Sequence, residues 1–347
     1  MAHRNFSMIE YLNRLAQGHV PELSFPGGGR RQWADWHAKA LAKLEELLGP
    51  YPRKADPAPD VVYSVEEDGL IRERIIIDTE EHMSMPCVLL KPAGIASDGR
   101  NPAILCCHGH GAHAKENVSG NKTSPELLDA QNRANYNYAE QMARRGYVTL
   151  SPDLRVFGER SDGGNPYPGR DRCNVHFVRG IVLGVRTLTL NVHDMRCAVD
   201  YLQSRPEVDP ERIGMMGLSL GGTMTAFTSA VEPRIKAADV IGYMGSWKEL
   251  GVRTANFCGS QIVPDVYRYL DVPDLVGLIS PRPVLVEVGV HDTCFHIDDT
   301  LPAARRVQAI YEAAGAGDRF HLDLHPGEHM FAARKAFGFF DAFLKGR

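Results

Sequence analysis

The feature that most constrains this 347-residue chain is a Gly-x-Ser-x-Gly sequence formed by Gly217, Ser219 and Gly221. The apolar run 213–216 before it predicts a short buried strand, and the run 223–231 after it predicts a helix. A serine on a sharp strand-to-helix turn is exposed above the sheet. The flanking glycines remove side chains that would clash in so tight a turn. The pattern predicts a nucleophile elbow, and a glycine-rich turn with a helix-capping serine is the alternative.

Strand and helix patterns alternate along most of the chain. Strands are expected at 104–107, 147–151, 213–216, 237–241, 284–288 and 320–324, and helices at 127–145, 183–204, 223–231, 302–314 and 330–344. Residues 61–91 also carry strand signals, and the runs 75–77 and 87–90 within them predict an antiparallel hairpin at a sheet edge. This alternation predicts an α/β fold with a mainly parallel central sheet and helices on both faces. Ligands of such sheets bind at the carboxyl ends of the strands.

The domain organisation follows from the same patterns. Residues 1–60 are expected to form an N-terminal helical extension, with helices at 8–17 and 31–48, and residues 61–347 the catalytic domain. Two long insertions, at about 154–182 and 243–280, interrupt the alternation and are expected to shape a substrate pocket.

A serine nucleophile needs a base that takes its proton and a carboxylate that orients the base. Asp292 follows a predicted strand by a short turn and is the expected acid, and an aspartate that caps the next helix is the alternative. His329 lies in the loop after the last strand and is the expected base, because a glycine two residues earlier lets that loop turn the imidazole toward Ser219. His325, at the end of the strand, is the second candidate.

Two backbone N–H groups are expected to form an oxyanion hole: that of Leu220, directly after the nucleophile, and that of His110 in a His-Gly-His-Gly loop. The alternative for this loop is a metal site made of His108, His110, His113 and Glu116. A glycine-rich strand end favours backbone donors, and the sequence shows no second ligand cluster. No metal or organic cofactor is therefore expected.

These segments together resemble the α/β-hydrolase superfamily. The likeness is to bacterial dienelactone-hydrolase-like and acetyl-xylan-esterase-like enzymes, and to the catalytic domain of prolyl-oligopeptidase-type proteins. It spans about residues 70–345 and rests on His108-Gly-His-Gly111, Asp153-Leu-Arg155, Phe157-Gly-Glu159, 194–209, Arg212-Ile-Gly214, the elbow, Asp292 and Gly327-Glu-His-Met-Phe331. The resemblance implies Ser219 as nucleophile, His329 as general base and then acid, and Asp292 as its orienting partner.

Two departures from these families limit the function. True dienelactone hydrolases carry cysteine where this chain has Ser219, which argues against that reaction. Prolyl oligopeptidases carry an N-terminal propeller, and the residues ahead of position 70 are too few for one.

The two insertions hold the candidate substrate contacts. Arginines crowd the first insertion, and Arg155 among them is a candidate for holding a substrate carboxylate or sugar hydroxyls. Surface solvation and ion pairing are the alternative, and the resemblance favours a structural ion pair for Arg155. Aromatic residues of the second insertion, Trp247 among them, form either an apolar acyl or alcohol pocket or packed core.

Composition excludes several function classes. The net charge of −4 and the lack of a basic block argue against nucleic acid as a partner, and no apolar run has the roughly 18 residues of a membrane span. The first ten residues lack an apolar signal core, and the seven cysteines lie mostly in apolar runs, as buried thiols of a reducing compartment do. A cytoplasmic location without membrane partners is therefore expected.

The sequence as a whole predicts a serine hydrolase that cleaves carboxylic esters, small or acetylated ones, through an acyl-enzyme. Its expected partner is a small-molecule ester, and a homo-oligomer is compatible with the sequence. Two alternatives remain: a peptidase or amidase of the prolyl-oligopeptidase type, and a non-catalytic binding protein with the hydrolase fold.

Overall fold

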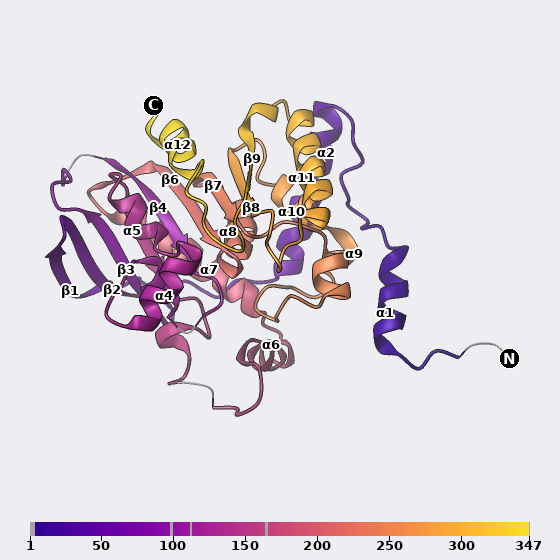
Figure 1. Cartoon of the computed structure of the whole chain (residues 1–347), viewed down its shortest axis with the longest axis horizontal. Coiled ribbons are helices and arrows are strands. Elements are labelled where there is room, and N and C mark those ends of the chain that lie inside the picture. The colour runs from indigo at the N-terminus through magenta and orange to yellow at the C-terminus, as the bar shows by residue number, and fades with distance from the viewer. Residues whose placement is uncertain (1–3, 98–99, 112, 164–165, 347) are drawn as a thin grey trace.

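The computed structural model of the protein describes residues 4–97, 100–111, 113–163 and 166–346. Within them, a nine-stranded sheet has the order β1-β2-β3-β5-β4-β6-β7-β8-β9 (Figure 1). The strands are β1 Asp60–Glu67, β2 Leu70–Glu80, β3 Met83–Pro92, β4 Asn101–Cys107, β5 Val148–Pro152, β6 Val208–Leu218, β7 Ile235–Ile241, β8 Val284–Gly289 and β9 Phe320–His325. The pairs β1-β2, β2-β3 and β3-β5 are antiparallel. The remaining pairs, from β5-β4 to β8-β9, are parallel. The expected mainly parallel sheet is confirmed.

Helices surround this sheet. The longer ones are α1 Met8–Gln17, α2 Arg30–Leu48, α4 Pro125–Ala134, α6 Arg172–Val182, α7 Thr187–Ser204, α8 Leu220–Val231 and α11 Ile297–Ala313. The shorter ones are α3 Ala114–Val118, α5 Tyr138–Ala143, α9 Val266–Tyr269, α10 Val272–Gly277 and α12 Ala336–Phe340. Short 3₁₀ or π segments are η1 Gly158–Arg160, η2 Lys248–Arg253, η3 Gly317–Arg319 and η4 Asp341–Lys345.

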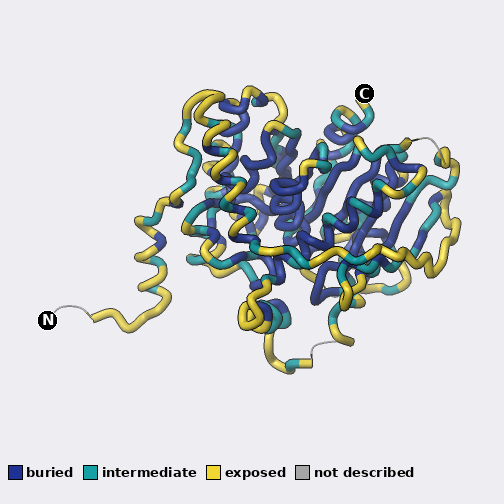
Figure 2. The backbone as a smooth tube through the Cα atoms, turned by 180° about the vertical axis from the view of Figure 1, so that it is seen from behind, coloured by how far each residue is buried: buried dark blue, intermediate teal, exposed yellow. Residues whose placement is uncertain are grey.

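The central strands of the sheet are buried on both faces. Along β4, Ala103 and Leu105 belong to one apolar cluster together with residues of α7 and α8, whereas Ile104 and Cys106 belong to another with residues of α5 and α12. Successive residues of a strand point to opposite faces, so helices must cover both. Figure 2 shows the central strands in the colour of buried residues, inside this covering.

Several predicted helices differ in extent. The single helix expected at 127–145 is two helices, α4 and α5, because Asn135 adopts a left-handed conformation (φ 50°) that ends α4. The helix expected at 183–204 begins only at Thr187, and α6 precedes it across a turn. Pro302 lies inside α11 instead of at its start, and the closing helix begins at Ala336.

The hairpin of β2 and β3 is confirmed as antiparallel, but it does not form the edge of the sheet. β1, at the start of the stretch 61–91 in which strand signals were expected, pairs with β2 and takes the edge. All eight residues of β1 are exposed, among them the apolar residues Val61, Tyr63 and Val65 at alternate positions of the strand.

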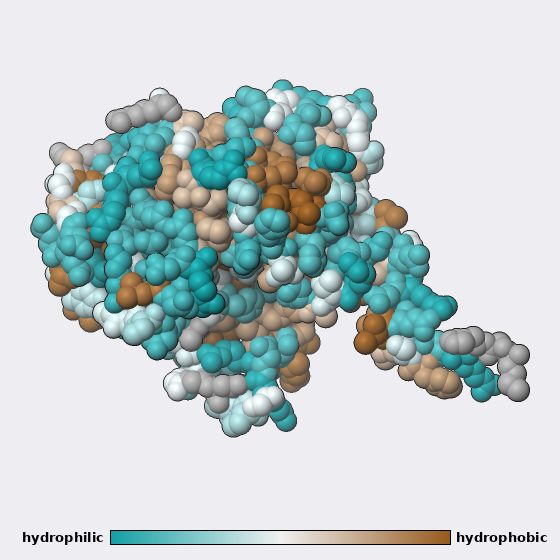
Figure 3. All heavy atoms as spheres, viewed as in Figure 1, coloured by the Kyte–Doolittle hydropathy of each residue, from teal (hydrophilic) through white to brown (hydrophobic). Residues whose placement is uncertain are grey.

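The N-terminal helices precede the sheet, as expected, and residues 1–3 of the expected extension lie outside the described part. α2 buries Trp36, Ala40 and Leu44 in the main apolar cluster. α1 projects from the body (Figure 2), and apolar patches on this projection are visible in Figure 3. Its segment exposes large apolar side chains at positions 6, 8, 9, 11, 12, 15 and 20.

Among the described residues, no single helix has the length and apolar character needed to cross a membrane. α6 and α7 pass that test of length and composition only when they are taken together, and they are bent by 95° relative to each other.

Three buried carboxyl groups lie on neighbouring strands: Asp239 on β7, Glu287 on β8 and Asp323 on β9. Glu287 Oε2 accepts a hydrogen bond from Ala332 N at 3.0 Å. Burial raises the pKa of Glu287 to about 8, and the nearby Asp323 carboxyl adds to the rise. Burial, Glu287 and Asp323 raise the pKa of Asp239 well above its usual range. The sheet interior therefore holds protons that the unfolded chain releases.

We expect this cluster to make the free energy of unfolding depend on pH. The carboxyl group of an unfolded glutamate has a pKa of about 4.3, whereas folded Glu287 keeps its proton up to about pH 8. Between these values the folded state binds the extra proton, so stability falls by about 1.4 kcal/mol per pH unit for this group. Glu287→Gln removes the titration, and its stability relative to the parent protein should rise from about pH 5 to about pH 8.

Urea denaturation at several pH values measures this difference, and the exposed Glu81→Gln serves as a matched control. A stability difference between Glu287→Gln and the parent protein that does not change with pH would contradict the assignment.

Candidate active site

Ser219 occupies a strained turn between β6 and α8. Its backbone has φ 63° and ψ −117°, a region that residues other than glycine rarely adopt. Its N–H donates to Ile241 O at 2.9 Å, which ties the turn to the end of β7. A Cβ on Gly221 would lie 2.1 Å from Cys107 O, so only glycine fits there. The local geometry is that of the predicted elbow.

The glycine loop after β4 lies directly against this serine. A Cβ on Gly109 would be 3.1 Å from Ser219 Cβ and 2.8 Å from a backbone oxygen of the elbow. The Gly109 N–H donates to Tyr136 Oη at 2.7 Å, so this amide is already occupied. The next amide along the loop belongs to His110. Leu220 is the first residue of α8, and its N–H therefore has no partner within the helix.

The side chain of His108 anchors the glycine loop through two hydrogen bonds. Its Nδ1–H donates to Gly109 O at 2.7 Å, and its Nε2 accepts from Leu154 N at 2.9 Å. Burial lowers the pKa of His108 to about 4 and keeps the ring neutral, as these two bonds require. Since both ring nitrogens of His108 are hydrogen-bonded within the protein, neither is available to a metal ion. This argues against the alternative metal site, which included His108.

The predicted acid and base contact each other. His329 Nδ1 lies 2.7 Å from Asp292 Oδ2, and Asp292 is 3 % exposed. Asp292 Oδ1 accepts the backbone N–H groups of Cys294 at 2.7 Å and Phe295 at 3.0 Å. The Phe295 ring stacks on the His329 ring with centroids 5.7 Å apart and planes 13° apart. These contacts fix both the carboxylate and the plane of the imidazole.

His329 and Ser219 flank the same strand end. A Cβ on Gly242 would lie 2.8 Å from His329 Cε1, and the preceding residue, Ile241, accepts the Ser219 N–H. Among the described residues, no hydrogen bond joins Ser219 Oγ to His329. Such contacts are often long in unliganded enzymes and shorten when substrate binds. The second candidate base, His325, is buried, and its Nδ1 accepts from a backbone N–H of its own loop.

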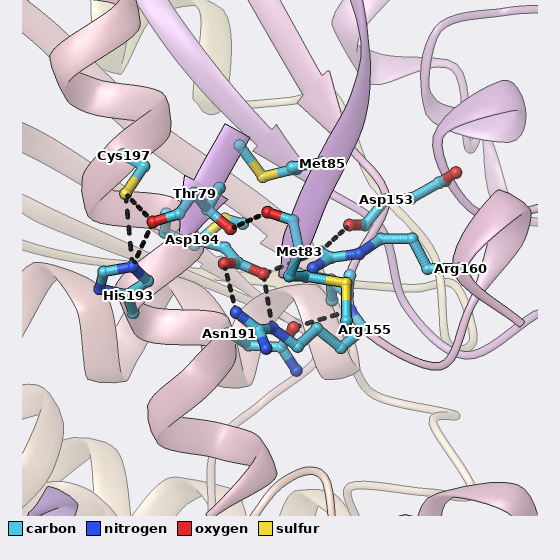
Figure 4. A network of polar contacts seen from close by, with 12 residues as sticks. Thr79, Met83, Met85, Asp153, Arg155, Arg160, Asn191, His193, Asp194 and Cys197 are labelled. Carbon is cyan, nitrogen blue, oxygen red and sulfur yellow. Dashed lines mark hydrogen bonds and ion pairs between the residues drawn. The ribbon is translucent and has the colours of Figure 1, made fainter. Parts of the chain in front are cut away.

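Arg155 is engaged within the protein. Its Nε and Nη2 each lie 2.9 Å from an oxygen of Asp194, and Arg160 contacts the same carboxylate at 2.8 Å (Figure 4). Burial alone would raise the pKa of Asp194, but Arg160 and Arg155 hold it below its usual range. Arg155 also contacts Glu80 and is 8 % exposed. These contacts support the structural ion pair that the resemblance implied, in place of a substrate contact.

Trp247 is a core residue of the second insertion. It is 3 % exposed and packs on Phe257 with centroids 4.9 Å apart. Phe257 and Tyr243 both contact Phe295, the ring that stacks on His329. Trp247 therefore supports an aromatic cluster behind the imidazole, and of these rings Phe257 is the partly exposed one.

Sequence reasoning missed a group beside the glycine loop. His110 Nε2 lies 3.1 Å from Cys258 Sγ, and Cys173 Sγ completes a cluster whose atoms all lie within 4.8 Å of one another. The hydrogen bond between the two thiols, followed by that from His110, lowers the pKa of Cys173, and the same bond between the thiols raises the pKa of Cys258. The three residues come from distant segments, so no spacing motif marks them. From the sequence alone, the two cysteines were interpreted as buried thiols.

Comparisons with known proteins agree with this fold. Residues 13–336 match the family described as "Abhydrolase family". The protein "Putative hydrolase YtaP" of Bacillus subtilis (strain 168) is 27% identical over 302 residues, which cover 85% of this chain and 95% of that protein.

Solved structures show the same fold at low identity. A "putative acetyl xylan esterase" from Bacteroides fragilis has a TM-score of 0.77 at 19% identity, covering 93% of this chain and 83% of that one. A glucuronoyl esterase from Solibacter usitatus has a TM-score of 0.66 at 15% identity, covering 93% and 97%. The expected α/β-hydrolase fold is thus confirmed, and since the family match extends over nearly the whole sequence, the chain belongs to the abhydrolase family.

Proposed function

We propose that this protein is a serine hydrolase that cleaves carboxylic esters, with Ser219 as nucleophile, His329 as base and Asp292 as orienting acid. The observation that carries the proposal is the 2.7 Å contact of His329 Nδ1 with Asp292 Oδ2, at the same strand end as a serine held at φ 63°. A neutral imidazole whose Nδ1–H faces a carboxylate presents its other nitrogen as a base.

The reaction then proceeds in two stages. Ser219 Oγ attacks the ester carbonyl while His329 Nε2 takes its proton, and the N–H groups of Leu220 and His110 stabilise the oxyanion. His329 next gives the proton to the departing alcohol, which leaves an acyl group on Ser219. A water molecule, deprotonated by His329, releases the acid and restores the serine.

The substrate class we propose is a small or acetylated carbohydrate ester. Acetyl xylan and glucuronoyl esterases are among the proteins with a similar fold. The aromatic cluster behind His329 and the half-buried Phe257 offer an apolar surface for a short acyl or alcohol group. Peptide substrates have no comparable supporting observation.

Covalent labelling tests the proposal directly. We expect a fluorophosphonate probe to modify one residue, Ser219, because this reagent phosphonylates a serine that a base activates. Mass spectrometry of the digested protein identifies the labelled peptide. Label on another residue, or none on protein that is folded, would refute the assignment.

A substrate panel then separates esters from amides. We expect turnover of p-nitrophenyl acetate and acetylated sugars, and no comparable turnover of aminoacyl amides. Preferential amide cleavage would point to the peptidase alternative, and ligand binding without turnover would point to a binding protein.

A further inference from the structure

The cluster of His110, Cys173 and Cys258 joins three segments of the chain beside the proposed nucleophile. His110 belongs to the glycine loop after β4, Cys173 to the first turn of α6, and Cys258 to the second insertion. One imidazole nitrogen and two sulfur atoms lie within 4.8 Å of one another, and His110 Nε2 is 3.1 Å from Cys258 Sγ. Three potential ligand atoms therefore converge on one point.

The surrounding protein already holds these segments together. The Gly259 N–H donates to Asn174 Oδ1 on α6 at 2.9 Å. A Cβ on Gly259 would lie 2.2 Å from Phe177 Cβ, so the absent side chain allows α6 to approach the loop of Cys258. The Phe157 and His110 rings form a T-shaped pair, with centroids 5.5 Å apart. The ligand atoms are thus positioned by packing.

The cluster also has a route to solvent. Cys173 is 2 % exposed and Cys258 is half-buried, whereas His110 is exposed. The exposed His110 and the half-buried Cys258 therefore place the cluster near the protein surface.

We propose that His110, Cys173 and Cys258 bind a divalent transition-metal ion of the zinc class. Thiolate and imidazole are the ligands that zinc prefers, whereas magnesium and calcium prefer oxygen. Three protein ligands leave a fourth tetrahedral position for water or a substrate atom. Both cysteines are free thiols, so both sulfur atoms are available as ligands.

Binding would connect the loop above Ser219 to both insertions. His110 also supplies the N–H that we propose for the oxyanion hole, so the ion would fix the backbone of that donor. Because the ion binds the folded state through three distant residues, it should also raise the melting temperature. This inference concerns metal binding and does not depend on ester cleavage.

Cobalt(II) titration of the reduced, full-length protein tests the proposal. We expect one Co²⁺ per chain, with the near-ultraviolet charge-transfer absorption of thiolate ligands and the intense visible bands of a tetrahedral site, and displacement of Co²⁺ by Zn²⁺. Cys258→Ser should lose the charge-transfer intensity of one thiolate and weaken binding at least about tenfold. Cys294→Ser removes a thiol from the other group of potential ligands among the described residues, Asp292, Cys294 and His329. It should bind Co²⁺ as the parent protein does if the ion occupies the His110 cluster.

Three results would overturn the proposal. These are the absence of stoichiometric Co²⁺ binding by the reduced protein, an unchanged spectrum in Cys258→Ser, and a loss of binding in Cys294→Ser that equals the loss in Cys258→Ser. A Cys173–Cys258 disulfide in protein purified without reductant, combined with no Co²⁺ binding after reduction, would identify the pair as redox-active instead. Should buried Cys173 prove intolerant of substitution, Cys258→Ser and His110→Ala still decide the question. Near-ultraviolet circular dichroism verifies the fold of each variant.

Discussion

Replacing Ser219 with alanine is expected to lower kcat for p-nitrophenyl acetate by a factor on the order of 10⁶. Without the hydroxyl no acyl-enzyme forms, and the remaining rate comes from water attack beside the oxyanion donors. The fold should survive, because alanine can occupy the φ 63° position about as well as serine and no hydrogen bond of the Ser219 side chain is lost among the described residues. Steady-state kinetics and thermal denaturation measure both effects.

A second serine provides the matched control. Ser229 lies on α8, is buried, and has a hydroxyl without a hydrogen-bond partner among the described residues. Ser229→Ala should therefore have the kcat of the parent protein and should still be labelled by the fluorophosphonate, whereas Ser219→Ala should not be labelled. A Ser219→Ala protein that retains more than about one per cent of the parent activity would show that another group is the nucleophile.

The elbow and the strand ends could be predicted because their signals are local. The apolar run before Gly217 and the helical run after Ser219 place the end of β6, the turn and α8, although β6 begins five residues before the run, at Val208. Asp292 and His329 could be placed because the carboxyl ends of parallel strands meet at one edge of a sheet. The contact between them then follows from topology, although its 2.7 Å distance does not.

Features that depend on single backbone states or on tertiary contacts could not be predicted. The left-handed Asn135 divides a helix whose apolar periodicity continues across the break. β1 lies in a stretch with strand signals, but only its pairing with β2 places it at the edge of the sheet, beyond the predicted hairpin. Cys173 and Cys258 converge on His110 only once α6 and the second insertion are folded, because no sequence spacing links them.

Replacing Asp292 with asparagine is expected to lower kcat by about 10⁴, with a small change in KM. An asparagine amide of the same shape donates to His329 Nδ1, so the ring carries its proton on Nε2 and cannot take the proton of Ser219. The side-chain oxygen that accepts the Cys294 and Phe295 N–H groups can remain, so the loop should keep its position. Steady-state kinetics separates kcat from KM, and the rate of fluorophosphonate labelling should fall in parallel with kcat.

The matched control is Asp298→Asn, which removes an exposed carboxylate in the first turn of α11, a few residues from Asp292. Both variants change the net charge equally, so a loss confined to Asp292→Asn depends on the contact with His329 and not on the local field. A loss below about tenfold in Asp292→Asn would mean that the ring finds its tautomer without this carboxylate. In that case another acceptor must orient His329, and the contact seen here would be structural. If kcat and the rate of labelling both fall by about the expected factor, Asp292 acts by orienting the imidazole of His329.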